Sequence, residues 1–259
     1  MKNLELIQLQ GNGVGSAIDA GHQAMLKSLS EPFVSVVMAG DGQMDPDDLE
    51  LLIEPVTKNQ ADYVKGNRFL HQDGLGNMPL VRKIASMVLG FFTTLAAGRH
   101  VTDPQCGYTA TSSLIIKHWN WSKSWKGYGY PNYWLIELSR RSMRVAEVPV
   151  KSIYGKEKSG IIMAKFFLSV GLMMLIMHHK RCFSMLFSKS VAPHTILSFI
   201  AYILGWITII PGVSTDLENE LTAGFASKLI LLVFCWVCAH ILDRLAVESR
   251  TELRVNAQT

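Results

Sequence analysis

The sequence has few charged residues and few cysteines. Only 18% of its 259 residues are Asp, Glu, Lys or Arg, against about 25% in a typical soluble domain. The four cysteines, Cys106, Cys182, Cys235 and Cys238, do not form the spacing of a disulfide framework. Cys235 and Cys238 are two residues of a C-x-x-C pattern, but they lie in an apolar run, where we expect them to pack. The net charge of +4 predicts attraction to anionic surfaces and not nucleic-acid binding.

Two common signatures are absent from the N-terminal stretch. "MKNLELIQLQGNG" contains no long apolar core and no cleavage site, so we predict no signal peptide. Gly11, Gly13 and Gly15 do not complete a G-x-G-x-x-G dinucleotide fingerprint, because Ser16 stands in the sixth position. "GNGVGSA" therefore indicates the entry of a helix.

Hydrophobic residues make up 49% of the chain and gather after about residue 160. His194–Val213 has no formal charge and is long enough to cross a bilayer core of about 30 Å. Phe225–Leu242 is slightly shorter, and its one charge, Lys228, lies near an end. We predict a transmembrane helical hairpin; a pair of buried core helices is the alternative.

The charges around this hairpin predict its orientation. Basic residues flank it on both sides, and its connection is acidic. By the positive-inside rule, both ends of the hairpin and the residues before it lie in the cytosol. Residues 160–181 are also apolar, but they end in a basic cluster. For this segment we prefer a helix at the cytosolic membrane interface to a third span.

Residues 1–160 alternate between strand and helix patterns. The predicted strands are 4–9, 33–39 and 61–69, and the predicted helices are 13–29, 45–58 and 78–98. Such alternation predicts an α/β fold with parallel strands. Ligands of these sheets bind at the carboxyl ends of the strands, where Asp41 and Arg68 fall.

Five motifs follow one another in a familiar order. They are "AGDGQMDPDDL", "ADYVKGNRF", "MPLVRKIASMVLG", "TDPQCGYTA" and "YGKEKSG". Together they resemble the family 2 glycosyltransferases over nearly all of residues 5–160. The likeness is greatest to the polyprenyl-phosphate branch, which includes dolichyl-phosphate mannosyltransferases and bacterial undecaprenyl-phosphate glycosyltransferases.

The resemblance implies an α/β fold of the GT-A type, a three-layer sandwich followed by the C-terminal transmembrane helical hairpin. It implies an inverting enzyme that moves a sugar from a nucleotide-diphosphate donor to polyprenyl (undecaprenyl or dolichyl) phosphate at the cytosolic face of the membrane. The family's opening "V-x-I-P-x-Y-N-E" segment has no counterpart here, so we expect the GT-A domain to be N-terminally incomplete. The alternative is a catalytically silent relative that acts as a membrane-bound binding protein.

These expectations divide the chain into four parts. We predict an incomplete GT-A catalytic domain over 1–159 and an interfacial helix over 160–192. The two-helix hairpin follows at 193–243, and a cytosolic tail occupies 244–259. Members of the family are often homo-oligomers, which the residues of this chain do not themselves indicate.

The resemblance also implies a divalent metal, Mg²⁺ or Mn²⁺. The family's D-x-D positions are Ala39 and Asp41 here, followed by Gln43, so Asp41 and Gln43 are the expected ligands. One carboxylate is compatible with Mg²⁺, which takes one or two from the protein. Asp45, directly before Pro46, is expected to cap the next helix.

Four basic residues match the family's phosphate-binding positions: Arg68, Arg82, Lys156 and Lys158. A phosphate monoester is already anionic near neutral pH, so it needs positive charge to hold it more than it needs a strong base. The alternatives are solvated charge for the arginines and contact with anionic lipid for the lysines.

Two further carboxylates, Asp103 and Glu137, are expected beside Asp41 in the catalytic pocket, with a capping or core-paired role as the alternative. The aromatic run Trp119–Trp134 is expected either to stack on sugar or to pack near the membrane interface.

Overall fold

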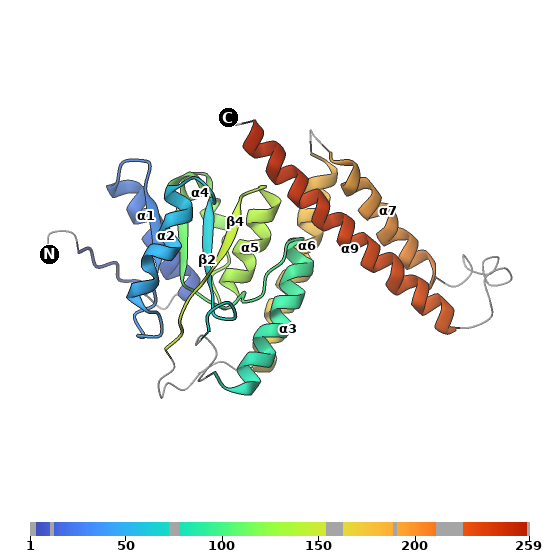
Figure 1. Ribbon diagram of the computed structural model, residues 1–259, viewed down its shortest axis with the longest axis horizontal. Helices are drawn as coiled ribbons and strands as arrows, with labels where there is room; N and C mark the ends of the chain where they lie inside the picture. Colours follow the sequence, from blue (N-terminus) through green and yellow to red (C-terminus); the bar gives the residue numbers. More distant parts are fainter. Residues whose placement is uncertain are drawn as a thin grey trace. The chain divides into compact units, whose positions relative to one another are not determined.

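The computed structural model describes residues 4–10, 13–72, 78–153, 163–188, 191–210 and 225–257. The chain divides into two compact units, residues 1–178 and 179–259 (Figure 1).

The first unit contains a four-stranded sheet and most of the helices. In chain order its elements are α1 (Val14–Ser28), β1 (Val34–Val37), the 3₁₀ turn η1 (Pro46–Asp48), α2 (Leu49–Thr57), β2 (Tyr63–Asn67), α3 (Leu80–Ala97), β3 (Thr109–Ser112), α4 (Ser113–His118), the 3₁₀ turn η2 (Trp121–Lys123), α5 (Tyr130–Arg140), β4 (Val145–Pro149) and the first part of α6 (Met163–Leu186). The structure confirms the three helices and two of the three strands predicted from the sequence pattern.

The prediction of a strand at residues 4–9 is wrong. These residues lie outside any strand, and Leu4 and Leu6 are 87% and 89% exposed. An apolar strand is stable only when a neighbouring strand and a covered face take up its backbone and side chains. None of the described strands pairs with this segment.

The sheet is mixed, in the order β1-β3-β2-β4. β2 and β4 are parallel, whereas β3 runs antiparallel to both β1 and β2. The prediction of parallel strands throughout is therefore wrong for β3. The chain returns after α3 to the end of β2, where Gly66 N bonds Tyr108 O at 2.8 Å. Because β3 starts where β2 ends, it must run in the opposite direction.

Helices cover both faces of the sheet. On one face, Leu52 of α2 packs against Val64, Ala110 and Val150. On the other face, α3, α4, α5 and the first part of α6 share a core that includes Trp134. This unit, with helices on both sides of a sheet, confirms the α/β part of the predicted fold class.

Helix ends follow local signals. Gly98 ends α3 in the left-handed conformation, with φ of 63°, as a glycine after a helix is expected to do. Asp45 accepts a hydrogen bond from Asp47 N, which confirms it as the cap of η1. The start of α2 is therefore fixed by the sequence directly after the Asp41 turn.

The second unit contains two paired helices and the C-terminal end of α6. Its helices are α7 (Pro193–Ile207) and α9 (Phe225–Asn256). Ser198 Oγ of α7 donates to Ala239 O of α9 at 2.8 Å, and the rings of Tyr202 and Trp236 stack. The acidic connection with Asp216, Glu218 and Glu220 lies outside the described residues.

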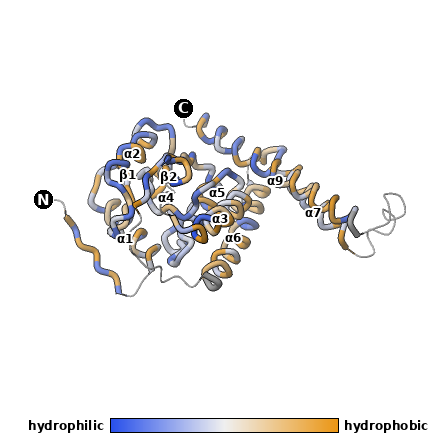
Figure 2. Tube along the Cα trace, turned by 60° about the horizontal axis from the view of Figure 1, so that its bottom comes forward, coloured by the Kyte–Doolittle hydropathy of each residue, from blue (hydrophilic) through white to orange (hydrophobic). Residues whose placement is uncertain are grey.

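Two described helical segments are long and apolar enough to cross a membrane: Leu80–Ala97 and Ser227–Asn256 (Figure 2). Length and composition alone are weak support for a span. Pro193–Ile207 is apolar but shorter. α9 continues unbroken from the predicted second span to Asn256.

Candidate active site

Asp41 lies in a tight turn after β1. Its Oδ1 accepts a hydrogen bond from Gln43 N at 3.0 Å, and the side chain is exposed. Gly42, between them, has φ of 74°, a conformation that favours glycine. The turn therefore presents the carboxylate of Asp41 to solvent in a fixed orientation.

Met44 anchors this turn to the sheet. Its sulfur accepts from Ala39 N at 3.2 Å, and its backbone bridges to Ser152. Gln43 O accepts from Ile153 N at 3.1 Å. The Asp41 turn is thus tied to the segment that follows β4. Lys156 and Lys158, three and five positions after Ile153, lie outside the described residues.

Arg68 and Asp103 form a buried ion pair. Arg68 Nε donates to Asp103 Oδ2 and Nη2 donates to Oδ1, both at 2.7 Å, and the backbone N of Arg68 adds a third bond to Oδ2 at 3.0 Å. Arg68 is 9% exposed and Asp103 is fully buried. Burial alone would raise the pKa of Asp103, but the hydrogen bonds and charge of Arg68, with Lys65 nearby, lower it. Asp103 is therefore an ionised carboxylate committed to Arg68.

Lys65 is a buried charge that the sequence pattern did not single out. It lies within β2, is fully enclosed, and its Nζ donates to the carbonyl oxygen of Cys106. Burial lowers the pKa of Lys65, while the negative groups of Asp103 and Glu147 act against that shift. The signal in the sequence was a lysine inside an otherwise uncharged strand, "YVKGN".

Glu147 of β4 was also missed. It stands opposite Lys65 in the parallel register, and its Oε2 accepts from Asn67 Nδ2 at 2.7 Å and from Thr102 Oγ1 at 3.3 Å. Two basic and two acidic side chains form a group that we call the β2 charge cluster: Lys65, Arg68, Asp103 and Glu147. Its signal was a single glutamate in a short apolar strand.

Glu137 lies away from this cluster. Its carboxylate binds Arg140 and Arg141, at 2.8 Å to Arg140 Nε and 2.9 Å to Arg141 Nε. Burial alone would raise the pKa of Glu137, but these two arginines lower it. Arg141 is close in sequence to Val145, which pairs with the first residue of β2. Glu137 therefore lies toward the opposite end of the sheet from Arg68. Its pairing with two arginines matches the core-paired role that was the alternative to a catalytic one.

Arg82 is exposed on the first turn of α3. Trp119 and Trp134 are buried and stacked, with ring centroids 3.9 Å apart. These two indoles belong to the core, so neither reading of the aromatic run applies to them. Tyr128, in contrast, is exposed.

The strands place the Asp41 turn and the β2 charge cluster at the same end of the sheet. β1 and β2 both run antiparallel to β3, so they are parallel to each other and end together. Met44 in the Asp41 turn lies beside Gly107, in the loop that carries Asp103. We call this region the carboxyl end of the sheet.

A hard cation fits the Asp41 turn better than it fits Asp103. Only one oxygen of Asp41 is used by the turn among the described hydrogen bonds, and the side chain is exposed. Both oxygens of Asp103 are occupied by Arg68. Carboxylate and amide oxygens, as in Asp41 and Gln43, are the ligands that Mg²⁺ and Mn²⁺ prefer.

Comparison with known proteins finds relatives for the first part of the chain. Residues 2–119 match the family described as Glycosyl transferase family 2. The chain is 32% identical over 145 residues to a Methanococcus voltae protein named "UDP-N-acetylglucosamine--dolichyl-phosphate N-acetylglucosaminyltransferase", an alignment that covers 56% of this chain and 57% of that protein. It is also 32% identical over 142 residues to an uncharacterized protein of Methanocaldococcus jannaschii, covering 55% and 58%. The chain thus spans a little over half the length of these curated relatives.

Proposed function

We propose that the chain is a family 2 glycosyltransferase that transfers a sugar from a nucleotide-diphosphate donor to a polyprenyl phosphate. Residues 2–119 match that family. The relative from Methanococcus voltae, whose name specifies UDP-N-acetylglucosamine and dolichyl phosphate, suggests these two substrates as the first to test. The observation that carries the proposal is the exposed Asp41 carboxylate, oriented by Gln43 N at the carboxyl end of the sheet.

The proposed reaction is a single displacement. An oxygen of the lipid phosphate attacks the anomeric carbon, the bond from that carbon to the donor diphosphate breaks, and the nucleotide diphosphate leaves with the bonding electrons. A divalent cation would neutralise charge on the leaving diphosphate. Asp41, with Gln43 beside it, is the residue proposed to hold that cation.

Positive charge is proposed to hold the lipid phosphate. Arg82 is exposed at the start of α3, which suits contact with an anionic headgroup. Lys156 and Lys158 stay predicted phosphate ligands. For Arg68 the bidentate pair with Asp103 supports a positioning role, in which both residues hold the loop after α3 against β2. A catalytic role for Glu137 stays a prediction.

A lipid acceptor requires an apolar surface near the site. α3 buries one face and exposes several large apolar side chains on the other: Val81, Ile84, Met87, Val88, Phe91 and Phe92. The first part of α6 does the same, burying Met173 and Met177 while exposing Leu172 and Ile176. Such two-sided helices suit the surface of a membrane better than its interior, which supports an interfacial α6.

We further propose that α7 and α9 form the membrane anchor. They pack along one another, and both expose large apolar side chains, among them Ile200, Ile203, Ile230 and Phe234. Exposed side chains of this kind are stable in lipid and not in water. The basic residues that flank the pair would place its ends in the cytosol.

Transfer assays with membranes that contain the full chain test this function. We expect labelled N-acetylglucosamine to pass from its UDP donor into dolichyl phosphate, and Asp41→Asn to lower the rate at least about 100-fold. Asp47→Asn, an exposed aspartate of the following turn, is the matched control and should keep most of the activity. Chelation by EDTA should stop transfer, and added Mg²⁺ or Mn²⁺ should restore it.

Equal rates for Asp41→Asn and the wild type would contradict the role of Asp41. No transfer from any nucleotide sugar by the wild type would favour the silent, membrane-bound relative instead.

A further inference from the structure

One oxygen of the Glu147 carboxylate is buried without a hydrogen-bond partner. Oε1 is closed off from solvent and accepts no hydrogen bond in the described part of the chain. Oε2 is held by Asn67 and Thr102. A carboxylate oxygen that loses its water without gaining a donor costs free energy, so such a group in a folded protein calls for an explanation.

The position of Glu147 favours a functional explanation. Asn67 directly precedes Arg68, and Thr102 directly precedes Asp103, so the residues that hold Glu147 adjoin the Arg68–Asp103 pair. Lys65 and Asn67 alternate with Gly66 along β2 and therefore share one face of the sheet, the face to which Glu147 also belongs. Glu147 thus lies near the carboxyl end of the sheet, where ligands of α/β folds bind.

The rest of the β2 charge cluster is already engaged. Both oxygens of Asp103 accept from Arg68, and the ammonium of Lys65 donates to Cys106 O. Oε1 of Glu147 is the one carboxylate oxygen of this cluster that accepts no hydrogen bond among the described residues. The cluster therefore contains one hydrogen-bond acceptor, Glu147 Oε1, that is available to a ligand.

A neutral hydroxyl is the donor that suits this oxygen. Two basic side chains, Lys65 and Arg68, already lie in the cluster, so a further cation would meet like charge in a buried place. A hydroxyl supplies an O–H and no charge. Sugars carry several hydroxyls, and a site built to accept from one of them discriminates strongly against an analogue that lacks it.

On the basis of the proposed function, we propose that Glu147 Oε1 accepts a hydrogen bond from one hydroxyl of the transferred sugar and so contributes to donor selectivity. Asn67 and Thr102 act as positioning residues, because they hold Oε2 and thereby orient the carboxylate. Binding of the sugar requires the side chains over Oε1 to move aside.

The test combines a variant with altered donors. In Glu147→Gln, the amide oxygen is expected to keep the bond from Asn67, which is a donor, so the amide nitrogen takes the place of Oε1. An acceptor is thereby replaced by a donor of nearly the same shape. Membranes with the full chain are assayed for transfer to dolichyl phosphate from UDP-N-acetylglucosamine and from its 3-deoxy, 4-deoxy and 6-deoxy analogues.

We expect the wild type to lose about 10- to 100-fold in kcat/KM with one of these analogues, the size expected for a hydrogen bond to a charged group. Glu147→Gln should be slower with the parent donor but lose little more with that analogue. For each protein, the ratio of kcat/KM between two donors is compared. The amount of folded protein is the same for both donors and therefore cancels from that ratio. Asp62→Asn is the control. Asp62 is a buried carboxylate that pairs with Arg144 beside the start of β2. Its replacement should leave the discrimination between the parent donor and the deoxy analogues unchanged.

Three results would overturn the role of Glu147. The first is wild-type transfer that is equally fast from all three analogues and the parent. The second is a Glu147→Gln variant that discriminates as the wild type does, as a purely structural carboxylate would. The third is no transfer from any donor by the wild type, which overturns the proposed function as well.

Discussion

His22 of α1 is a buried histidine. Its Nδ1 lies 2.8 Å from Ser35 Oγ, and its ring lies near the indoles of Trp121 and Trp134. No carboxylate is hydrogen-bonded to the ring among the described contacts. Burial lowers the pKa of His22 from 6.5 to about 4, so the folded protein keeps it neutral.

This shift predicts a loss of stability in mild acid. Above pH 6.5 the imidazole is neutral in both the folded and the unfolded chain, so its contribution is complete. As pH falls from 6.5 to about 4, only the unfolded chain gains the proton, and the folded state loses up to about 3 kcal/mol. We expect His22→Gln to flatten the pH dependence of thermal unfolding in this window, followed by Trp fluorescence of the full chain in detergent.

The exposed His100 supplies the control, since His100→Gln should leave that pH dependence as it is. A wild-type Tm that does not change between pH 6.5 and pH 4.5 would contradict the buried, neutral state of His22.

Single residues were predicted from the sequence where a local motif fixed their place. Asp41 and Asp45 are such residues, because the turn and the cap need only neighbours in the chain. The pairing of Arg68 with Asp103 joins residues 35 positions apart, and no periodicity in the sequence encodes it. For the same reason Lys65 and Glu147, whose roles depend on the register of β2 and β4, were not found.

At the scale of elements, helices were predicted better than strands. α3 combines helical apolar spacing with a glycine stop, and both signals are local. β3 and β4 are only four and five residues long and contain Thr, Ser and Glu, so they lack the apolar alternation that marks a strand. The direction of β3 depends on where the loop after α3 returns, which sequence spacing does not reveal.

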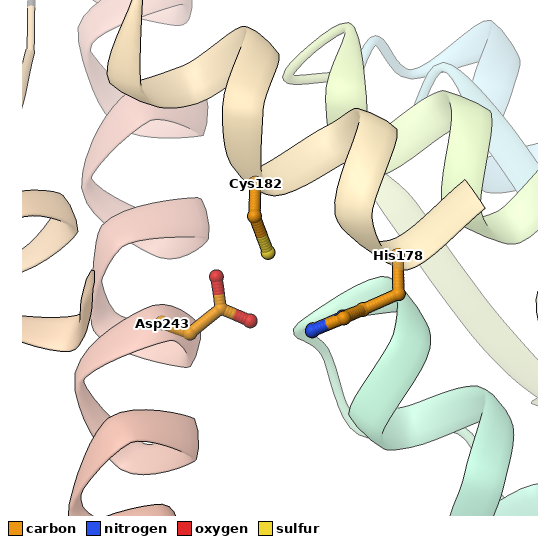
Figure 3. Close-up of side chains that lie close together, drawn as sticks. All are labelled: His178, Cys182 and Asp243. Carbon is orange, nitrogen blue, oxygen red and sulfur yellow. The ribbon is translucent and has the colours of Figure 1, made fainter. Parts of the chain in front are cut away.

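A buried ion pair joins two helices of the second unit. Arg181 of α6 is fully enclosed and binds Asp243 of α9 bidentately, at 2.9 Å and 2.6 Å. Figure 3 shows the Asp243 carboxylate from α9 beside Cys182, the residue after Arg181 in α6. In apolar surroundings each charge depends on the other, because neither can be solvated alone.

Breaking this pair should therefore weaken the helical unit strongly. We expect Arg181→Met or Asp243→Leu to cost about 3–5 kcal/mol, and the double variant Arg181→Met/Asp243→Leu to recover much of that loss. Thermal unfolding of the detergent-solubilised chain measures both effects. The pair Arg244–Glu248, half exposed and one turn apart on α9, is the control, and Glu248→Ala should change little. Additive losses in the double variant would show that the two side chains are not coupled.

At the scale of the whole molecule, two sequence signals support the proposed function. The family match covers residues 2–119, and the apolar helices α6, α7 and α9 follow that segment. Composition alone separated the two halves, since hydrophobic residues gather in the second. The exposed apolar side of α3, within the family-matched segment, was not predicted, because a helical apolar pattern does not reveal how much of the helix the rest of the fold covers.

The central claim is that a lipid phosphate is the acceptor of the sugar. The most direct measurement incubates the purified full chain, in vesicles that contain dolichyl phosphate, with UDP-N-acetylglucosamine and Mg²⁺, and follows the lipid product by mass spectrometry. Parallel vesicles contain dolichol without the phosphate. We predict a dolichyl-phosphate product that carries one N-acetylglucosamine, and none from dolichol. Equal product from both lipids, or no glycolipid from this donor or any other nucleotide sugar, would contradict the account.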